Sequence, residues 1–102
     1  MYRIDFNQIK WETTEQGVSA KSFQEETRQI RLLEFGPDLN HQEWCEIGHL
    51  GYVLEGEFEI EFANQVIKFK KGDGISIPPG EKDKHRPKAL SKKVRLIFFE
   101  EL

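Results

Sequence analysis

Apolar residues recur at every second position through most of the chain, which is the period of a β-strand rather than of an α-helix. The clearest segment is 57–62, where Phe58, Ile60 and Phe62 alternate with glutamates and are expected to face a core. Similar or continuously apolar segments predict further strands at 2–6, 28–35, 49–54, 66–69, 75–77 and 94–99. Several of these segments end at glycine or proline turns, so the pattern favours an all-β fold, either a sandwich or a jelly-roll barrel.

The same pattern predicts local pairing and burial. Residues 49–54 and 57–62 are separated only by Glu55-Gly56 and are expected to form a hairpin. The segment 94–99 is apolar except at Arg95, which is typical of a strand buried on both faces. Residues 81–93 are polar and rich in lysine and predict a loop, whereas 14–28 is compatible with either a helical turn or an edge strand.

Composition limits the class of protein. A chain of 102 residues with 37% hydrophobic residues can form one modest core, so we expect a single domain over 1–102. The net charge of −3 provides no cationic field for nucleic acid or an anionic membrane. No apolar run is typical of a secretory signal or a membrane span, and the single cysteine, Cys45, can form no internal disulfide. These features favour a cytoplasmic protein that binds neither nucleic acid nor membrane.

Two stretches resemble the paired motifs of the cupin superfamily. In the segment GDGISIPPG, Gly72, Pro78 and Gly80 have the types and spacing with which the second cupin motif begins. Gly36 and Gly56 have the spacing of the two glycines that enclose the first motif. The resemblance implies a cupin-type jelly-roll β-barrel with a pocket for a small molecule, and it implies a homodimer. Known cupins range from metal-dependent dioxygenases and isomerases to sugar-binding proteins, so the fold does not select an activity.

The metal-binding positions of the first motif are substituted. In one spacing, Gln42, Trp44 and His49 stand where cupins have two histidines and a glutamate. In the other spacing that the family allows, Glu43 and Cys45 replace the two histidines, and both share a strand face with His49 if the segment is regular. The first register gives a poor ligand set and the second a plausible one, and the sequence leaves the choice open.

The second motif places Asp83 at the position of its histidine, and His85 follows two residues later. We expect His85 to take that role, since an even offset keeps it on the same face of an extended segment. The candidate metal ligands are therefore His49, His85, Glu43 and Cys45, and the candidate ligand-pocket residues are Gln42, Trp44, His49 and His85. The third histidine, His41, is expected in a solvated loop.

The implied cofactor is a divalent metal ion, namely iron, manganese, nickel or zinc. The alternative is a barrel that binds no metal, because several metal-binding positions of the motifs are substituted. The first functional hypothesis is a small-molecule-binding cupin in which the metal acts as a Lewis acid. The alternatives are a non-catalytic module for ligand sensing or dimerisation and a metal-free isomerase or epimerase with His49 as base. Cys45 also has a simpler interpretation as a small buried hydrophobe. The sequence specifies neither a substrate nor a catalytic residue.

Overall fold

The computed structural model describes residues 2–39 and 43–102, and almost all regular structure in them is antiparallel β-sheet. The larger sheet has the order β1-β2-β3-β9-β4-β7, formed by β1 (Glu12–Glu15), β2 (Val18–Glu25), β3 (Arg28–Phe35), β9 (Val94–Glu101), β4 (His49–Glu55) and β7 (Gly74–Ile77). The smaller sheet has the order β6-β5-β8, formed by β6 (Val66–Lys70), β5 (Glu57–Phe62) and β8 (His85–Ala89). Two 3₁₀ helices, η1 (Phe6–Gln8) and η2 (Glu81–Asp83), complete the regular structure.

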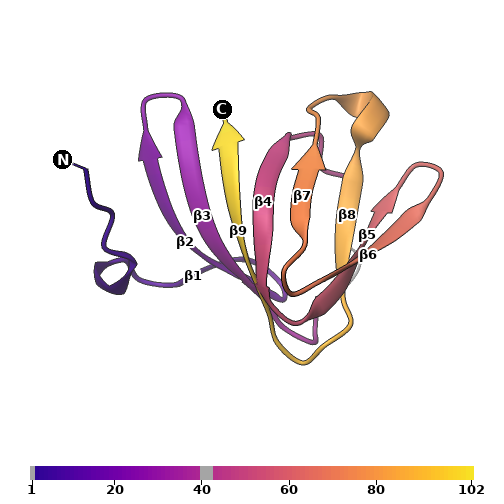
Figure 1. Ribbon diagram of the computed structural model, residues 1–102, viewed down its shortest axis with the longest axis horizontal. Helices are drawn as coiled ribbons and strands as arrows, with labels where there is room; N and C mark the ends of the chain where they lie inside the picture. Colours follow the sequence, from indigo (N-terminus) through magenta and orange to yellow (C-terminus); the bar gives the residue numbers. More distant parts are fainter. Residues whose placement is uncertain (1, 40–42) are drawn as a thin grey trace.

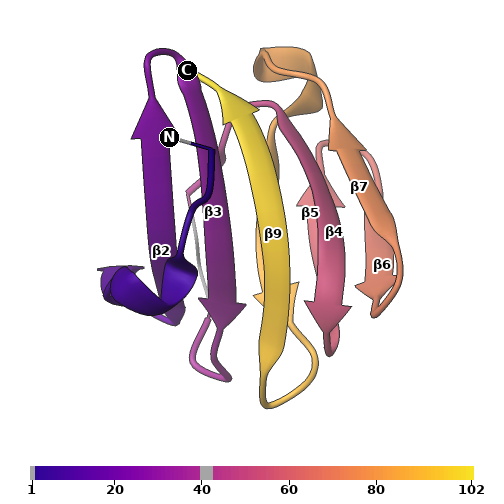
Figure 2. The same cartoon turned by 60° about the vertical axis from the view of Figure 1, so that its left-hand side comes forward.

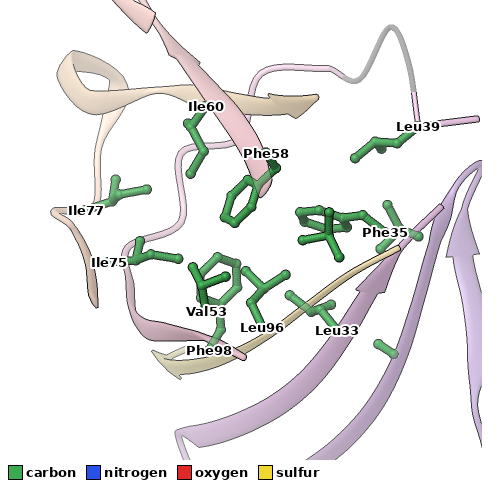
Figure 3. Packing of buried hydrophobic residues seen from close by; sticks show 13 residues of the cluster. Leu33, Phe35, Leu39, Val53, Phe58, Ile60, Ile75, Ile77, Leu96 and Phe98 are labelled. Atoms are coloured by element: carbon green, nitrogen blue, oxygen red, sulfur yellow. The ribbon is translucent and has the colours of Figure 1, made fainter. Parts of the chain in front are cut away.

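The two sheets face each other and share one core. In Figure 2 the larger sheet stands in front, with β5 and β6 of the smaller sheet behind it. Val53 from β4, Leu96 from β9 and Phe58 from β5 are 0% exposed and meet between the sheets (Figure 3). The expected inward orientation of β5 is confirmed, since Phe58 and Ile60 are buried and Phe62 packs against the core. Burial of each large apolar side chain stabilises the fold by about 1.5–3 kcal/mol.

The predicted hairpin between 49–54 and 57–62 is wrong. β4 pairs with β7 and β9 in the larger sheet, whereas β5 pairs with β6 and β8 in the smaller one. Gly56 lies where the chain passes from one sheet to the other, and its φ of 85° is one that glycine adopts without steric cost. A Cβ at Gly56 would also meet the backbone oxygen of Lys93. The single residue Gly56 between β4 and β5 therefore serves here as a crossing between sheets.

Two loop and strand assignments also need correction. Residues 2–5 form no strand, and 6–8 form η1, whose first turn is capped by Asp5 because its Oδ1 accepts a hydrogen bond from the Asn7 backbone N–H at 3.0 Å. The predicted loop 81–93 contains β8, which pairs with β5. The polar composition conceals this strand, because β8 contributes His85 and Pro87 on one face rather than an aliphatic run.

The remaining assignments concern the larger sheet. The ambiguous segment 14–28 contains the end of β1, an edge strand, and the whole of β2, so the edge-strand alternative holds for β1. The prediction that 94–99 is buried on both faces is wrong. Val94, Leu96 and Phe98 are buried in the core, whereas Phe99 on the outer face is 50% exposed. No helix in the described part of the chain has the length and apolar character needed to cross a membrane.

Candidate metal centre

Polar side chains gather at one end of the barrel, at the edge of the hydrophobic core. This is the end at which β3, β4 and β8 begin and β9 finishes, at the top of Figure 1. Cys45, His49 and His85 lie there, and one ligand atom from each falls within 4.8 Å of the other two. The two histidines are 5% and 4% exposed, and Cys45 is partly buried. The cluster thus joins two potential metal ligands four residues apart, Cys45 and His49, with a third, His85, from a distant part of the chain.

Backbone pairing explains why these residues meet. His49 begins β4 opposite Ile77 of β7 and shares its inward face with the buried Val53. Cys45 forms an isolated antiparallel bridge with His85, in which the Cys45 N–H donates to the His85 carbonyl at 2.8 Å and the reverse bond is 3.0 Å. Paired residues of an antiparallel bridge have their side chains on the same side, so Cys45 and His85 point together.

His85 has one occupied ring nitrogen and one unpaired one. Its Nδ1 lies 3.0 Å from the carbonyl oxygen of Asp83, a geometry in which Nδ1 carries the proton and donates it. The other nitrogen, Nε2, is then a bare acceptor, and it is buried without a hydrogen-bond partner among the described residues. An unpaired buried polar atom costs about 1–3 kcal/mol. A metal ion bound at Nε2 would remove that cost.

His49 is held from several directions. Its Nδ1 lies 2.6 Å from Oε2 of Glu100, although the N–H direction is not aligned for a linear hydrogen bond. Its ring stacks on Phe98 with a centroid distance of 4.2 Å and an interplanar angle of 11°. Phe98 can lie this close because Gly51, two residues along β4, has no Cβ, which would lie 2.7 Å from the Phe98 ring. On its other side, His49 Nε2 is 3.9 Å from the Cys45 Sγ.

The thiol of Cys45 and the imidazole of His49 favour each other's charged forms. The hydrogen bond with His49 lowers the pKa of Cys45 from its ordinary value, and burial only partly opposes this. Burial acts to lower the pKa of His49, but contacts with Cys45 and Glu100 outweigh it, so this pKa is raised. The thiolate is the form of cysteine that binds metals. The lowered pKa of Cys45 therefore favours its thiolate over the neutral, apolar thiol.

Glu100 is a functional candidate that the sequence reasoning missed. Burial acts to raise the pKa of its carboxyl, but the contacts with His49, Arg31 and Gln29 outweigh burial and lower that pKa from 4.5 to about 2. A signal was present in the sequence, because Glu100 continues the inward phase of Val94, Leu96 and Phe98. A charged residue at an inward position of a strand is typical of a buried ion pair or a functional site.

Two other expected site residues, Glu43 and Trp44, are not members of the cluster. Glu43 is exposed and is not in the cluster. Trp44 is half-buried, and its ring is covered by Arg86, whose guanidinium carbon is 4.2 Å from the ring centroid, and by Lys84 at 5.2 Å. Gln42 and His41 lie outside the described residues. Of the second register, the structure retains Cys45, whose Sγ lies 3.9 Å from His49 Nε2, but not Glu43, because residues 46–48 form no regular strand.

Two imidazoles and one thiolate are a ligand set that suits a metal ion. Catalytic metal sites commonly use three protein ligands and leave further positions open for water or substrate. Cysteine and histidine together favour a borderline or soft metal such as zinc, copper or iron over magnesium or calcium. The unpaired Nε2 of His85 and the lowered pKa of Cys45 both fit such an ion.

Solved structures of other proteins share this fold. An RmlC-like cupin from Shewanella frigidimarina has a TM-score of 0.79 at 16% identity, with 99% of this chain and 90% of that chain covered. KdgF from Halomonas sp. has a TM-score of 0.76 at 21% identity, with coverages of 94% and 89%. The polyketide cyclase RemF from Streptomyces resistomycificus has a TM-score of 0.76 at 19% identity, with coverages of 99% and 79%. Identities this low show the fold alone.

The comparison with protein families agrees with the architecture. No curated protein matches the chain. The model of the cupin domain matches residues 34–100, which is more than half of the chain. This range contains both motif-like stretches and all three members of the Cys45, His49 and His85 cluster. The predicted all-β jelly-roll fold is confirmed, and the chain belongs to the cupin family.

Proposed function

We propose that this cupin binds a divalent metal ion through Cys45, His49 and His85 and receives a small-molecule ligand beside it. The observation that carries the proposal is the set of three ligand atoms within 4.8 Å of one another. It is supported by the contacts of both histidines, whose Nδ1 atoms face Asp83 and Glu100. When bound, such a metal supplies Lewis-acid activation of a carbonyl group or of dioxygen.

The chain's own residues would prepare this site by setting proton positions. The Asp83 carbonyl keeps a proton on Nδ1 of His85 and leaves Nε2 able to bind. The Cys45 and His49 pair is biased toward a thiolate and an imidazolium, and the proton on His49 Nε2 would leave when a metal binds. Of the metals expected for a cupin, zinc, iron and nickel suit this set better than manganese, which prefers carboxylates.

Metal analysis tests the proposal directly. Protein purified without a chelator or an affinity tag, dialysed and then titrated with Zn²⁺, should bind about one ion per chain, and binding should release protons. Calorimetry in two buffers of different ionisation enthalpy measures both quantities. A bound amount below about a tenth of an ion per chain, with no affinity on titration, would overturn the proposal and favour the metal-free alternatives.

The outer face of the larger sheet supports a homodimer. Leu50 and Tyr52 on β4 and Phe99 on β9 point outward and are 61%, 48% and 50% exposed. Leu50 and Phe99 are cross-strand partners, and both line a groove of about 560 Å³ that has residues 2–4 on its wall. Exposed apolar patches of this kind mark interaction sites. We propose a second copy of the chain as the partner, in keeping with the cupin family.

A charge placed on this face should dissociate the dimer. Leu50→Glu would place a carboxylate in the interface, which should raise the dimer dissociation constant at least about thirtyfold, or about 2 kcal/mol. Sedimentation velocity of the wild type and the variant measures this change. Val66→Glu is the matched control, because Val66 is 57% exposed on β6 of the other sheet and should leave the dimer intact. A monomeric wild type would refute the assignment.

The single-domain organisation over 1–102, the cytoplasmic location and the expected lack of nucleic-acid and membrane partners stay predictions from the sequence.

A further inference from the structure

The buried carboxylate of Glu100 contacts the cluster of Cys45, His49 and His85, but Glu100 is not one of the proposed metal ligands. Its side chain is 1% exposed, and both of its oxygens are engaged. Oε1 accepts hydrogen bonds from Gln29 Nε2 and Arg31 Nε, each 2.7 Å long. Oε2 accepts one from Arg31 Nη2 at 2.6 Å and lies 2.6 Å from His49 Nδ1. Four nitrogens therefore surround this one carboxylate.

Strand pairing places these groups from three strands side by side. Gln29 on β3 is the direct cross-strand partner of Glu100 on β9, and Arg31 lies two residues further along the same inward face of β3. β4 lies on the other side of β9, and its Leu50 pairs with Phe99, so His49 adjoins Glu100. The carboxylate thus lies between the cationic side chain of Arg31 and the imidazole.

Both imidazoles of the cluster are contacted at the same ring atom. The Glu100 carboxylate faces Nδ1 of His49 at 2.6 Å as an ion-pair contact, without hydrogen-bond alignment, and the carbonyl of Asp83 accepts a hydrogen bond from Nδ1 of His85. The other ring nitrogen of His49, Nε2, faces Cys45 and lies 3.9 Å from its Sγ. The other ring nitrogen of His85, also Nε2, is buried without a hydrogen-bond partner in the described part of the chain. Metal-binding histidines usually present one nitrogen to the metal and the other to a carboxylate or a carbonyl.

We infer that Glu100 is a positioning residue of the metal centre: it holds His49 through Nδ1 so that Nε2 faces the metal, and Arg31 and Gln29 hold the carboxylate. This inference rests on the proposed function. It differs from a purely structural role, in which Glu100 would only neutralise the partly buried Arg31. A structural role predicts a loss of stability alone, whereas a positioning role predicts weaker metal binding in folded protein.

Cobalt titration of Glu100→Gln separates the two roles. Glutamine has nearly the same size as glutamate but lacks the negative charge that faces His49. We expect the Co²⁺ affinity of the folded variant, measured from the thiolate-to-cobalt absorption band, to fall about 10–100-fold. Leu33→Ala is the control, because Leu33 is 2% exposed in the core on β3 and its loss destabilises the same sheet away from the cluster. An affinity of Glu100→Gln within about twofold of wild type, or an equal loss in Leu33→Ala, would overturn the inference.

A second measurement needs no variant and decides the matter if Glu100→Gln does not fold. Wild-type protein with nitrogen-labelled histidine is loaded with NMR-active cadmium, and the ring nitrogens that couple to the metal are identified. The inference expects coupling at Nε2 of His49, with a proton on Nδ1. Coupling at Nδ1 would refute the role of Glu100 and leave the metal site standing. Failure to bind cadmium, zinc or cobalt would instead refute the proposed function, and the inference with it.

Discussion

Cys45→Ser, His49→Ala and His85→Ala are each expected to lower the affinity for Zn²⁺ by at least about a hundredfold. Loss of a residue that hydrogen-bonds to a metal ligand typically lowers the metal affinity about 10–100-fold. Loss of one of three ligands should therefore lower the affinity by at least the upper limit of that range. The ligand atoms of the three residues lie within 4.8 Å of one another, which is why removal of any one of them should have this effect. Calorimetric titration of each purified variant measures the change.

Glu43→Ala is the matched control for these three variants. Glu43 is a ligand candidate in the sequence, but it is exposed and outside the cluster, so its replacement should leave the Zn²⁺ affinity unchanged. Circular dichroism would establish that each variant is folded before the titration. If His85→Ala bound Zn²⁺ as tightly as wild type, the proposed ligand set would be wrong. If Glu43→Ala lost binding, the ligand set would have to include Glu43.

Acidification is expected to remove about 3 kcal/mol of stability through Glu100 alone. The pKa of this carboxyl is about 2 in the folded protein and 4.5 ordinarily, and at about 1.4 kcal/mol per pH unit the difference corresponds to about 3 kcal/mol. Because the folded value is the lower one, this stability is present above the ordinary pKa and is lost as the pH falls from about 5 towards 2. Urea unfolding at several pH values measures the loss.

The contribution of Glu100 can be isolated from that of the other carboxylates. Glu100→Gln removes the titrating group, so the difference in unfolding free energy between wild type and this variant should shrink as the pH falls. Glu34→Gln is the control, because Glu34 also pairs with an arginine across β3 and β9 but is 33% exposed, where water screens the pair. It should keep the wild-type pH dependence. A difference between wild type and Glu100→Gln that is constant with pH would contradict the lowered pKa.

Protonation of His49 also affects the stability of the fold, but at higher pH than protonation of Glu100 and with the opposite sign. The pKa of His49 is raised in the folded protein, so the stability gained from its charged form is present below its ordinary value of 6.5 and is lost as the pH rises through the folded value. His49 and Glu100 contact each other, and both are charged only at pH values above the folded pKa of Glu100 and below the folded pKa of His49. Metal-free protein should therefore be most stable in mildly acidic solution, whereas a bound metal would replace the proton on His49 Nε2.

The alternation in 57–62 was enough to identify the inward residues of β5, because a strand that separates a core from solvent needs period-two polarity. The glycine and proline spacing resembles the cupin motifs, and that resemblance implied the barrel; turn geometry explains why glycine and proline stand at those positions. Neither feature could say which strand pairs with which. The short link at Gly56 is compatible with both a hairpin and a crossing, and only the packing of two sheets around Phe58 and Val53 selects the crossing.

For the candidate site too, the sequence identified residue types, and the tertiary structure decided which of them meet. The sequence by itself offered His49, His85, Glu43 and Cys45 as candidate ligands, because imidazole, carboxylate and thiol groups near the two motifs are chemically suited to metal binding. The tertiary structure alone decided that Cys45 rather than Trp44 points toward the histidines, because that orientation depends on the bridge between Cys45 and His85, which are distant in sequence. It also brought Glu100 to His49 through the pairing of β4 with β9: the inward phase of Glu100 was visible in the sequence, but its partner was not, because the pairing of two strands distant in sequence leaves no local signal.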